Sequence, residues 1–340
     1  MIIRSKAPLR IGLAGGGTDV SPYSDIYGGA ILNATINMYA CATIIPRNNN
    51  KIIINAADRN EIIEYRSARE LPLDGNLDLI KAIYNRIVKN FNTGKLSFEI
   101  TTYVDTPPGS GLGSSSTLVT AITGAFAEWL NLPLGEYDIA NLAYIVERID
   151  LNYAGGKQDQ YAATFGGFNF MEFYANDKVI VNPLRIKSNV LDELAYTLVL
   201  YYTGTSRLSS KIIEKQQSSI IKKNTGSVEA MHRTKEMAIL MKEAVLKGEL
   251  DTIGPIMMEA WNHKKKMARG ISNKKLDLIY ESAVRAGATG GKISGAGGGG
   301  FMFYYCPGNT RFNVITELKK FGGTIQPFQF TKSGLKTWRF

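Results

Sequence analysis

Residues 107–117 combine residue types that suit the binding of phosphate. Gly109, Gly111 and Gly113 alternate through this segment, and three serines and a threonine follow them. Glycines let the backbone approach a ligand without a Cβ in the way. Apolar residues at helical spacing come next, so the serines are predicted to begin a helix, whose free N–H groups and dipole attract anions. A capped helix after a tight turn would need fewer glycines and hydroxyls, so we favour a polyphosphate cradle.

Two widespread phosphate loops do not fit this segment. A Walker A loop requires a lysine directly after its last glycine, and Ser114 stands there instead. A dinucleotide fingerprint has a different glycine spacing and belongs to the first strand of a fold. The cradle is therefore of another kind.

Two further glycine-rich segments lie near the ends of the chain, at residues 14–19 and 292–303. In the first, Thr18 and Asp19 follow three consecutive glycines. Asp19 could bind paired hydroxyls of a sugar, and a helix N-cap or turn role explains it equally well. The second holds five glycines in the six positions 295–300. That many glycines cost too much backbone entropy to serve packing alone.

Three charged residues are candidates for a site, and two of them stand where a charge is unusual. Arg10 interrupts an apolar strand predicted over residues 1–13, so it either forms a structural ion pair or points into a site. Glu147 lies near the C-terminal end of a helix predicted over residues 136–150, where the helix dipole disfavours a carboxylate and a nearby cation or metal is indicated. Asp159 falls in a predicted glycine-containing loop, for which an ordinary surface turn is the commoner explanation.

Alternating and helical hydrophobic periods predict a chain of mixed strands and helices. Strands are expected at 30–45, 51–56, 61–66, 96–104, 196–202 and 324–330. Helices are expected at 78–88, 114–129, 209–221, 228–246, 251–267, 273–286 and 310–321. Arg207 and Lys211 follow the strand at 196–202, and ligand-binding groups are common beyond strand ends.

The composition is that of a soluble globular protein. The chain has 340 residues, 44% hydrophobic and 21% charged, which leaves room for two domains. There is no run of eighteen apolar residues, so no membrane span is expected. Arg4 and Lys6 interrupt the short apolar start, so no signal peptide is expected either. The only cysteines, Cys41 and Cys306, are read as reduced thiols of a cytoplasmic protein.

The net charge of +10 comes mostly from residues 205–275, which hold 15 Lys or Arg against 7 Asp or Glu. Neither an RNA-binding aromatic signature nor zinc-finger spacing accompanies this excess, so we expect no nucleic-acid partner. Residues 264–266 are three lysines that we predict to form a solvated helix face. An anionic small-molecule substrate would account for the remaining charge.

The three glycine-rich segments, in this order, resemble those of the GHMP kinases. They read APLRIGLAGGGTD, PPGSGLGSSS and KISGAGGGGFMF, and the similarity spans the whole chain. The resemblance implies an α+β fold of two domains. These would be an N-terminal ATP-binding domain over residues 1–185 and a C-terminal, ferredoxin-like α+β domain over residues 186–340, with the active site between them.

The first segment departs from galactokinase, which has Gly-Glu-His-Thr-Asp where this chain has three glycines before Thr18 and Asp19. This version, together with GGKQDQYAATFGG, is most similar to members that phosphorylate the anomeric hydroxyl of D-glycero-D-manno-heptose 7-phosphate. Their 1,7-bisphosphate product feeds nucleotide-activated heptose synthesis for surface polysaccharide. Two alternatives stay open: a kinase of a free sugar like L-fucokinase, or a non-catalytic regulator that binds sugar and ATP.

The resemblance also implies roles for individual residues. Asp159 would be the catalytic carboxylate with Arg10 as its basic partner, and Ser115 and Glu147 would bind Mg²⁺. The ATP phosphates would contact Pro108, Gly109, Ser110, Gly111, Leu112, Gly113, Ser114, Ser115 and Ser116. The substrate would contact Gly16, Gly17, Thr18, Asp19, Gly156, Gly297 and Gly298.

On charge alone, we expect Arg207 and Lys211 to hold the phosphate that a phosphorylated sugar carries. The partners expected are therefore ATP, Mg²⁺ and a small phosphorylated sugar, with neither a membrane nor a nucleic acid. The oligomeric state stays open, with a homodimer as one option.

Overall fold

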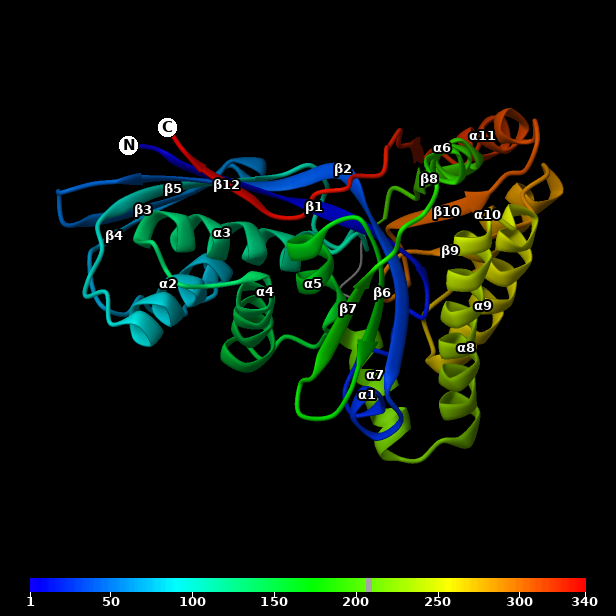
Figure 1. Ribbon diagram of the computed structural model, residues 1–340, viewed down its shortest axis with the longest axis horizontal. Helices are drawn as coiled ribbons and strands as arrows, with labels where there is room; N and C mark the ends of the chain where they lie inside the picture. Colours follow the sequence, from blue (N-terminus) through cyan, green and yellow to red (C-terminus); the bar gives the residue numbers. More distant parts are fainter. Residues whose placement is uncertain (206–209) are drawn as a thin grey trace.

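The computed structural model describes residues 1–205 and 210–340, which fold around two β-sheets that lie side by side (Figure 1). The first sheet has eight strands and the second has four. Helices pack against both sheets. In the described parts of the chain, no helix is long and apolar enough to cross a membrane.

The first sheet is built on one long strand that other strands share. Its members are β1 (Ile3–Ala14), β2 (Gly29–Pro46), β3 (Lys51–Ala56), β4 (Glu61–Arg66), β5 (Phe98–Val104), β6 (Phe168–Phe173), β7 (Val179–Pro183) and β12 (Lys336–Arg339). The order is β12-β1-β2-β5-β3-β4, and β3 and β5 are parallel. The first part of β2 pairs with β6 and its second part with β5, so the sheet divides along β2.

Helices of the first domain pack against one face of this sheet (Figure 1). The short α1 (Tyr23–Tyr27) instead buries Tyr23 in a cluster with Val199 and Tyr201. The helices on this face are α2 (Asp78–Phe91), α3 (Ser114–Leu130), α4 (Glu136–Ile145) and α5 (Gln158–Phe165). Their apolar faces make the core. In α2, Ile80, Ile83 and Ile87 recur at helical spacing and are buried in a cluster with Ile52 and Ile100 of the sheet.

The second domain has the ferredoxin-like order that the resemblance to the GHMP kinases implied. Its strands are β8 (Leu198–Tyr202), β9 (Gly290–Ile293), β10 (Phe301–Tyr305) and β11 (Thr324–Ile325). They are antiparallel in the order β11-β8-β10-β9, with helices between β8 and β9 and between β10 and β11. The helices are α6 (Ser188–Thr197), α7 (Ser210–Ile221), α8 (Thr225–Lys247), α9 (Ile253–Met267), α10 (Lys274–Arg285) and α11 (Arg311–Lys319). The fold is thus a two-domain α+β fold, as predicted.

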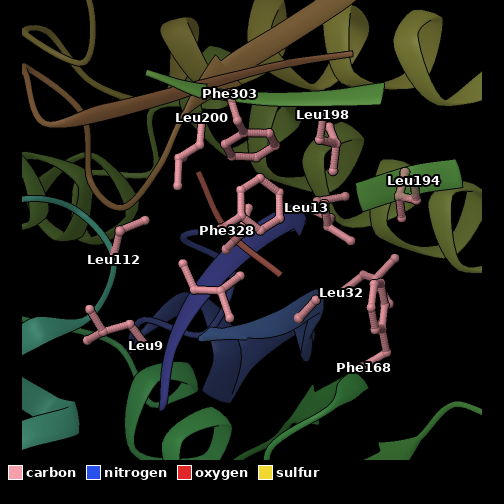
Figure 2. Packing of buried hydrophobic residues seen from close by; sticks show 14 of the residues in the cluster. Leu9, Leu13, Leu32, Leu112, Phe168, Leu194, Leu198, Leu200, Phe303 and Phe328 are labelled. Atoms are coloured by element: carbon pink, nitrogen blue, oxygen red, sulfur yellow. The ribbon is translucent and has the colours of Figure 1, made fainter. Parts of the chain in front are cut away.

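One hydrophobic core joins the two domains (Figure 2). Leu9, Leu13 and Phe168 enter it from the first domain, and Leu200 and Phe303 enter it from the second sheet. All five side chains are buried. Because apolar area buried between domains resists their separation, this core holds the two domains together.

The end of the chain returns to the first domain, which differs from the expected second domain of residues 186–340. Phe330 bridges Ile36, and β12 then pairs with β1. The two termini lie next to each other, with the Ile2 N–H 2.7 Å from the Phe340 carbonyl oxygen. The final strand therefore belongs to the first sheet, and the tail of the chain connects both domains.

Several predicted elements differ from the structure at their ends. The helix expected at 136–150 ends at Ile145 and continues as a π-helical turn over Val146–Asp150. The expected strand at 196–202 begins only at Leu198, because α6 runs through Thr197. Only Thr324–Ile325 of the expected strand at 324–330 forms one. Asp159, expected in a loop, lies in the first turn of α5.

Candidate active site

A cavity of about 660 Å³ lies where the two domains meet. The loop after β1, the residues before and within the first turn of α3, the turn after α4 and the start of α5 form its first-domain wall. From the second domain, α7, α9 and the loop after β9 complete it. It therefore collects the three glycine-rich segments that the sequence singled out.

Residues 107–113 form a tight loop that leads directly into α3. Gly109, Gly111 and Gly113 have φ values of 73°, 85° and 83°, a left-handed conformation that glycine adopts without strain. Hydroxyls fix this loop to the helix start, because Ser114 Oγ lies 2.9 Å from Ser110 Oγ. The first turn of α3 therefore presents its N–H groups at the cavity wall, as an anion site requires.

Asp159 and Arg10 form an ion pair in the cavity. Arg10 Nε donates to Asp159 Oδ1 at 2.7 Å, and Arg10 Nη2 lies 2.5 Å from the same oxygen. Arg10 also donates to the Gly111 carbonyl at 2.7 Å, so it links the carboxylate to the phosphate loop. A Cβ on Gly113 would come within 3.1 Å of the Asp159 carboxyl carbon, which places this carboxylate beside the start of α3.

Glu147 is a buried carboxylate next to α3. The π-helical turn carries it, and its side chain is 2% exposed. Ser115 Oγ donates to Glu147 Oε1 at 2.8 Å, and Gln160 Nε2 donates to Glu147 Oε2 at 2.5 Å. Arg148 Nη2 lies 3.7 Å from Glu147 Oε2. A hydroxyl and a carboxylate oxygen in contact are hard ligands of the kind that Mg²⁺ takes.

Asp19 is buried between the loop after β1 and the start of α5. Its Oδ2 accepts hydrogen bonds from the backbone N–H groups of Lys157 at 2.8 Å and Gln158 at 3.0 Å. Burial raises the pKa of the Asp19 carboxyl, and the charge of Asp159 acts in the same direction, against these N–H donors. A Cβ on Gly156 would lie 1.9 Å from Asp19 Oδ2, so only glycine fits there. Asp19 thus lines the cavity and also stabilises the N-terminus of α5.

Comparison with known families fits this arrangement. Residues 78–167 match the GHMP kinases N terminal domain, and residues 241–324 match the GHMP kinases C terminal domain. The D-glycero-alpha-D-manno-heptose 7-phosphate kinase of Campylobacter jejuni is 52% identical over 337 residues, which are 99% of each chain. The chain belongs to the GHMP kinase family. It is accordingly a sugar kinase homologue, a phosphotransferase that uses ATP and an alcohol as acceptor.

Two solved GHMP-type structures resemble it over nearly their whole length. A D-glycero-D-manno-heptose 1-phosphate kinase from Bacteroides thetaiotaomicron superposes with a TM-score of 0.85 at 47% identity, covering 99% of both chains. A putative sugar kinase from Campylobacter jejuni gives 0.83 at 51% identity, covering 100% of this chain and 98% of that one. The two relatives that are named for their substrate thus agree on a heptose phosphate and differ in the position of its phosphate.

Most residues that the sequence predicted for a GHMP site line this one cavity. They are Arg10, Gly16, Gly17, Asp19, Gly109, Ser110, Gly111, Gly113, Ser114, Ser115, Ser116, Glu147, Gly156 and Asp159. Two members of the predicted ATP loop do not line it. Pro108 is exposed, and Leu112 is buried in the core shared by the domains.

Other predicted substrate residues lie outside the cavity lining. The hydroxyl of Thr18 is 2.9 Å from the Gly15 carbonyl and accepts the Ala30 N–H, so it holds the glycine turn. Gly298 donates to the Ile271 carbonyl, and a Cβ on Gly297 would lie 2.7 Å from that oxygen. Lys211 is exposed on α7, and Arg207 lies outside the described residues.

Lys264 corrects the prediction of a solvated lysine face at residues 264–266. Its side chain is 5% exposed and lines the cavity, whereas Lys266 is exposed as predicted. The sequence did hold a signal for this, because Met257, Trp261 and Lys264 fall on one helical stripe whose other members are apolar. A cation on the buried stripe of a helix beside a glycine loop is a site candidate that charge counting alone overlooks.

Proposed function

We propose that the protein transfers the γ-phosphoryl group of ATP to the anomeric hydroxyl of D-glycero-D-manno-heptose 7-phosphate, giving the 1,7-bisphosphate. The similarity to heptose phosphate kinases over 99% of the chain supports this substrate class. The product would serve the synthesis of nucleotide-activated heptose. The free-sugar kinase and the non-catalytic regulator have less support.

The Asp159–Arg10 pair is the observation that carries the proposal. It lies between the loop that would hold the nucleotide phosphates and Asp19, which would bind sugar hydroxyls. Asp159 would accept the proton of the attacking sugar hydroxyl. The hydroxyl oxygen would then bond to the γ-phosphorus, while the bond from this phosphorus to the β–γ bridging oxygen breaks and ADP leaves. Arg10 would stabilise the negative charge that develops.

The residues at Ser115 and Glu147 fit a Mg²⁺ ion that binds together with the nucleotide. The described ranges contain no cluster of three or more His, Cys, Asp or Glu side chains that could hold a metal ion. Mg²⁺ usually takes one or two protein oxygens and completes its shell with phosphates and waters, which matches a serine and a glutamate. When bound, the ion would neutralise charge on the phosphates.

The formation of ADP from ATP in the presence of Mg²⁺ and each of a panel of acceptors tests the proposal. The panel holds D-glycero-D-manno-heptose 7-phosphate, the corresponding 1-phosphate, the unphosphorylated heptose, L-fucose, galactose and mevalonate. We expect turnover with the 7-phosphate and little with the free heptose, and phosphorus NMR of the product should locate the new phosphate on the anomeric oxygen. The 1-phosphate is included because the named relatives differ at this point.

Each other outcome leads to a different conclusion. Preference for the 1-phosphate would support a heptose phosphate kinase but would mean that the anomeric hydroxyl is not the acceptor. Turnover of fucose or another free sugar would contradict the phosphorylated substrate. If no acceptor in the panel supports ADP formation although the protein still binds ATP, the non-catalytic regulator would be favoured.

We also place this reaction in the cytoplasm. Cys41 and Cys306 are both free thiols, and burial raises the pKa of Cys306 to about 12, so it is held as an unreactive thiol. A supply of ATP and of a phosphorylated sugar fits the same compartment. Fractionation of cells, followed by detection of the protein in the soluble cytoplasmic fraction, checks this placement.

A further inference from the structure

Lys264 is a buried lysine that faces the cavity. It lies on α9 among the apolar side chains of Met257, Trp261 and Met267, and only 5% of it is exposed. Its ammonium nitrogen donates to the Gly295 carbonyl at 2.5 Å. The same nitrogen lies 3.5 Å from the position that a Cβ on Gly16 would take. The charge is therefore held between the loop after β1 and the loop after β9.

This position is next to the phosphate loop. A Cβ on Gly295 would lie 2.8 Å from the Gly111 Cα, so the two loops are in contact where Lys264 is anchored. Arg10 also donates to the Gly111 carbonyl. Lys264 and Arg10 thus flank one junction, at the point where a nucleotide phosphate on the loop would meet an acceptor beside Gly16.

The lysine has donors that the protein does not use. An ammonium group carries three N–H donors, and within the described residues Gly295 is the single hydrogen-bond acceptor for it. No carboxylate in the described ranges lies within ion-pair distance of Lys264, although Asp19 and Asp159 line the same cavity. A buried charge without a counter-ion is costly unless a ligand supplies one. The vacant donors therefore suit an anionic ligand.

Charged groups approach Lys264 from each neighbouring element. Arg10 comes from β1, Asp19 from the loop after it, Asp159 from α5 and Lys292 from β9. Glu214 of α7 lines the same cavity. Burial lowers the pKa of Lys264 to about 8, and the Arg10 charge acts the same way, while Asp19 and Asp159 oppose both. The positive charge is thus half lost at about pH 8 and decreases further as the pH rises.

We propose that Lys264 is a further catalytic residue, whose ammonium contacts an oxygen of the phosphoryl group as it passes from nucleotide to acceptor. This inference rests on the proposed function, since it requires a phosphoryl group between the loops at Gly111 and Gly16. In such a transfer, negative charge spreads over the equatorial oxygens. A preorganised cation at that place stabilises it without reorganisation during the reaction.

The variants Lys264→Met, Lys264→Arg and Lys266→Met test the role of Lys264. Each is assayed with the acceptor that the wild-type protein prefers. We expect Lys264→Met to lower kcat about 100-fold or more, the usual effect of losing one stabilising donor. Its ATP affinity, measured by calorimetry without acceptor, should stay within about threefold of the wild type. Lys266→Met, on the exposed face of the same helix, is the matched control and should leave kcat unchanged.

The pH profile gives a readout that a structural role would not move. In the wild type, kcat/KM reports the free enzyme, so it should fall above about pH 8 as Lys264 loses its proton. In Lys264→Arg this alkaline fall should be absent, because a guanidinium stays protonated. A wild-type profile that is flat to pH 9, or a fall that persists in Lys264→Arg, would overturn the proposal.

Two kinetic outcomes also decide against it. A Lys264→Met variant with kcat within threefold of the wild type contradicts the contact with the phosphoryl group. So does a variant that changes only the KM for the sugar, since Lys264 would then bind the acceptor alone. Removal of a buried charge should not unfold the domain. If the Met variant nevertheless fails to fold, Lys264→Arg decides by its pH profile. A wild type that is inactive on both heptose phosphates would contradict the proposed substrate instead.

Discussion

The Asp159 carboxylate has one oxygen bound by Arg10 and faces the cavity beside Gly113. Asp159→Asn keeps an oxygen for Arg10 and removes the proton acceptor. We expect kcat to fall by about 100- to 10,000-fold, the range of general-base contributions. ATP affinity should change little, because the amide neither blocks nor repels the phosphates. Steady-state kinetics and calorimetry on the same sample measure both quantities.

The comparison of turnover with binding separates the explanations for Asp159. Loss of ATP binding together with turnover would mean that Asp159 holds the loop in place. A kcat within tenfold of the wild type would exclude it as the base. A thermal melt of the variant is needed alongside, because Arg10 is buried and loses its counter-ion.

Glu147 offers a second test at the scale of single residues. Glu147→Gln keeps an oxygen for Ser115 and removes the negative charge. We expect the Mg²⁺ concentration for half-maximal activity to rise about tenfold or more, since a neutral oxygen is a poorer ligand for a hard cation. Glu136→Gln, an exposed position at the start of α4, is the control. An unchanged Mg²⁺ requirement would mean that Glu147 only positions Ser115 and Gln160.

At the scale of elements, the loop before α3 depends on its contact with the loop after β9. Gly111 has a φ of +85°, and a Cβ there would lie 2.6 Å from the Ser294 carbonyl oxygen. Gly111→Ala should therefore displace the loop as well as strain it, and ATP affinity should fall about tenfold or more. Gly94→Ala is the matched control, because Gly94 has a φ of +72° and nothing within 4 Å of the added Cβ.

Stability and affinity together distinguish these two glycine variants. A left-handed alanine costs about 1–2 kcal/mol of stability at either position. Only Gly111→Ala should also weaken ATP binding. Equal ATP affinities for both variants would show that the contact with Ser294 is not needed to shape the loop. Chemical denaturation measures the free energy of unfolding, and calorimetry measures the ATP affinity.

Local signals in the sequence were sufficient to find the elements around the loop. Glycine spacing and an apolar helical period predicted the turn at residues 107–113 and the start of α3 at Ser114, as observed. The π-helical turn that carries Glu147 was not predictable, because its extra residue changes no hydrophobic period visible over five residues. Asp159 was expected in a loop but lies in the first turn of α5. The N–H groups at the start of this helix are bound by Asp19, which is distant in sequence, so no local signal marks the start.

At the scale of the whole molecule, the two domains were predicted in their order and their ferredoxin-like second sheet, but not in their connection. The tail after Phe330 is short and mixed in polarity, so it has no hydrophobic period that would predict its pairing with β1. Likewise, the burial of Lys264 depends on how α9 packs across the domain interface. Both depend on contacts between segments that are far apart in the sequence, which a local pattern cannot show.

The returning tail gives a test of how far the two domains depend on each other. Gly334 packs directly on the end of α5, where a Cβ would lie 1.9 Å from the Thr164 carbonyl oxygen. The next residue, Leu335, donates its N–H to that same oxygen at 3.0 Å. Gly334→Ala must push the tail away from the first domain, and overpacking of this kind costs about 1–3 kcal/mol.

We therefore expect Gly334→Ala to lower the melting temperature of the protein by several degrees, at about 2–4 °C for each kcal/mol. Gly226→Ala, in the first turn of α8, meets only the Asn224 side chain at 3.6 Å and should leave the melting temperature equal or higher. Because the domains share one core, a single cooperative transition should persist in both variants. A Gly334→Ala protein that melts in two separate steps would mean that the tail, more than the shared core, couples the domains.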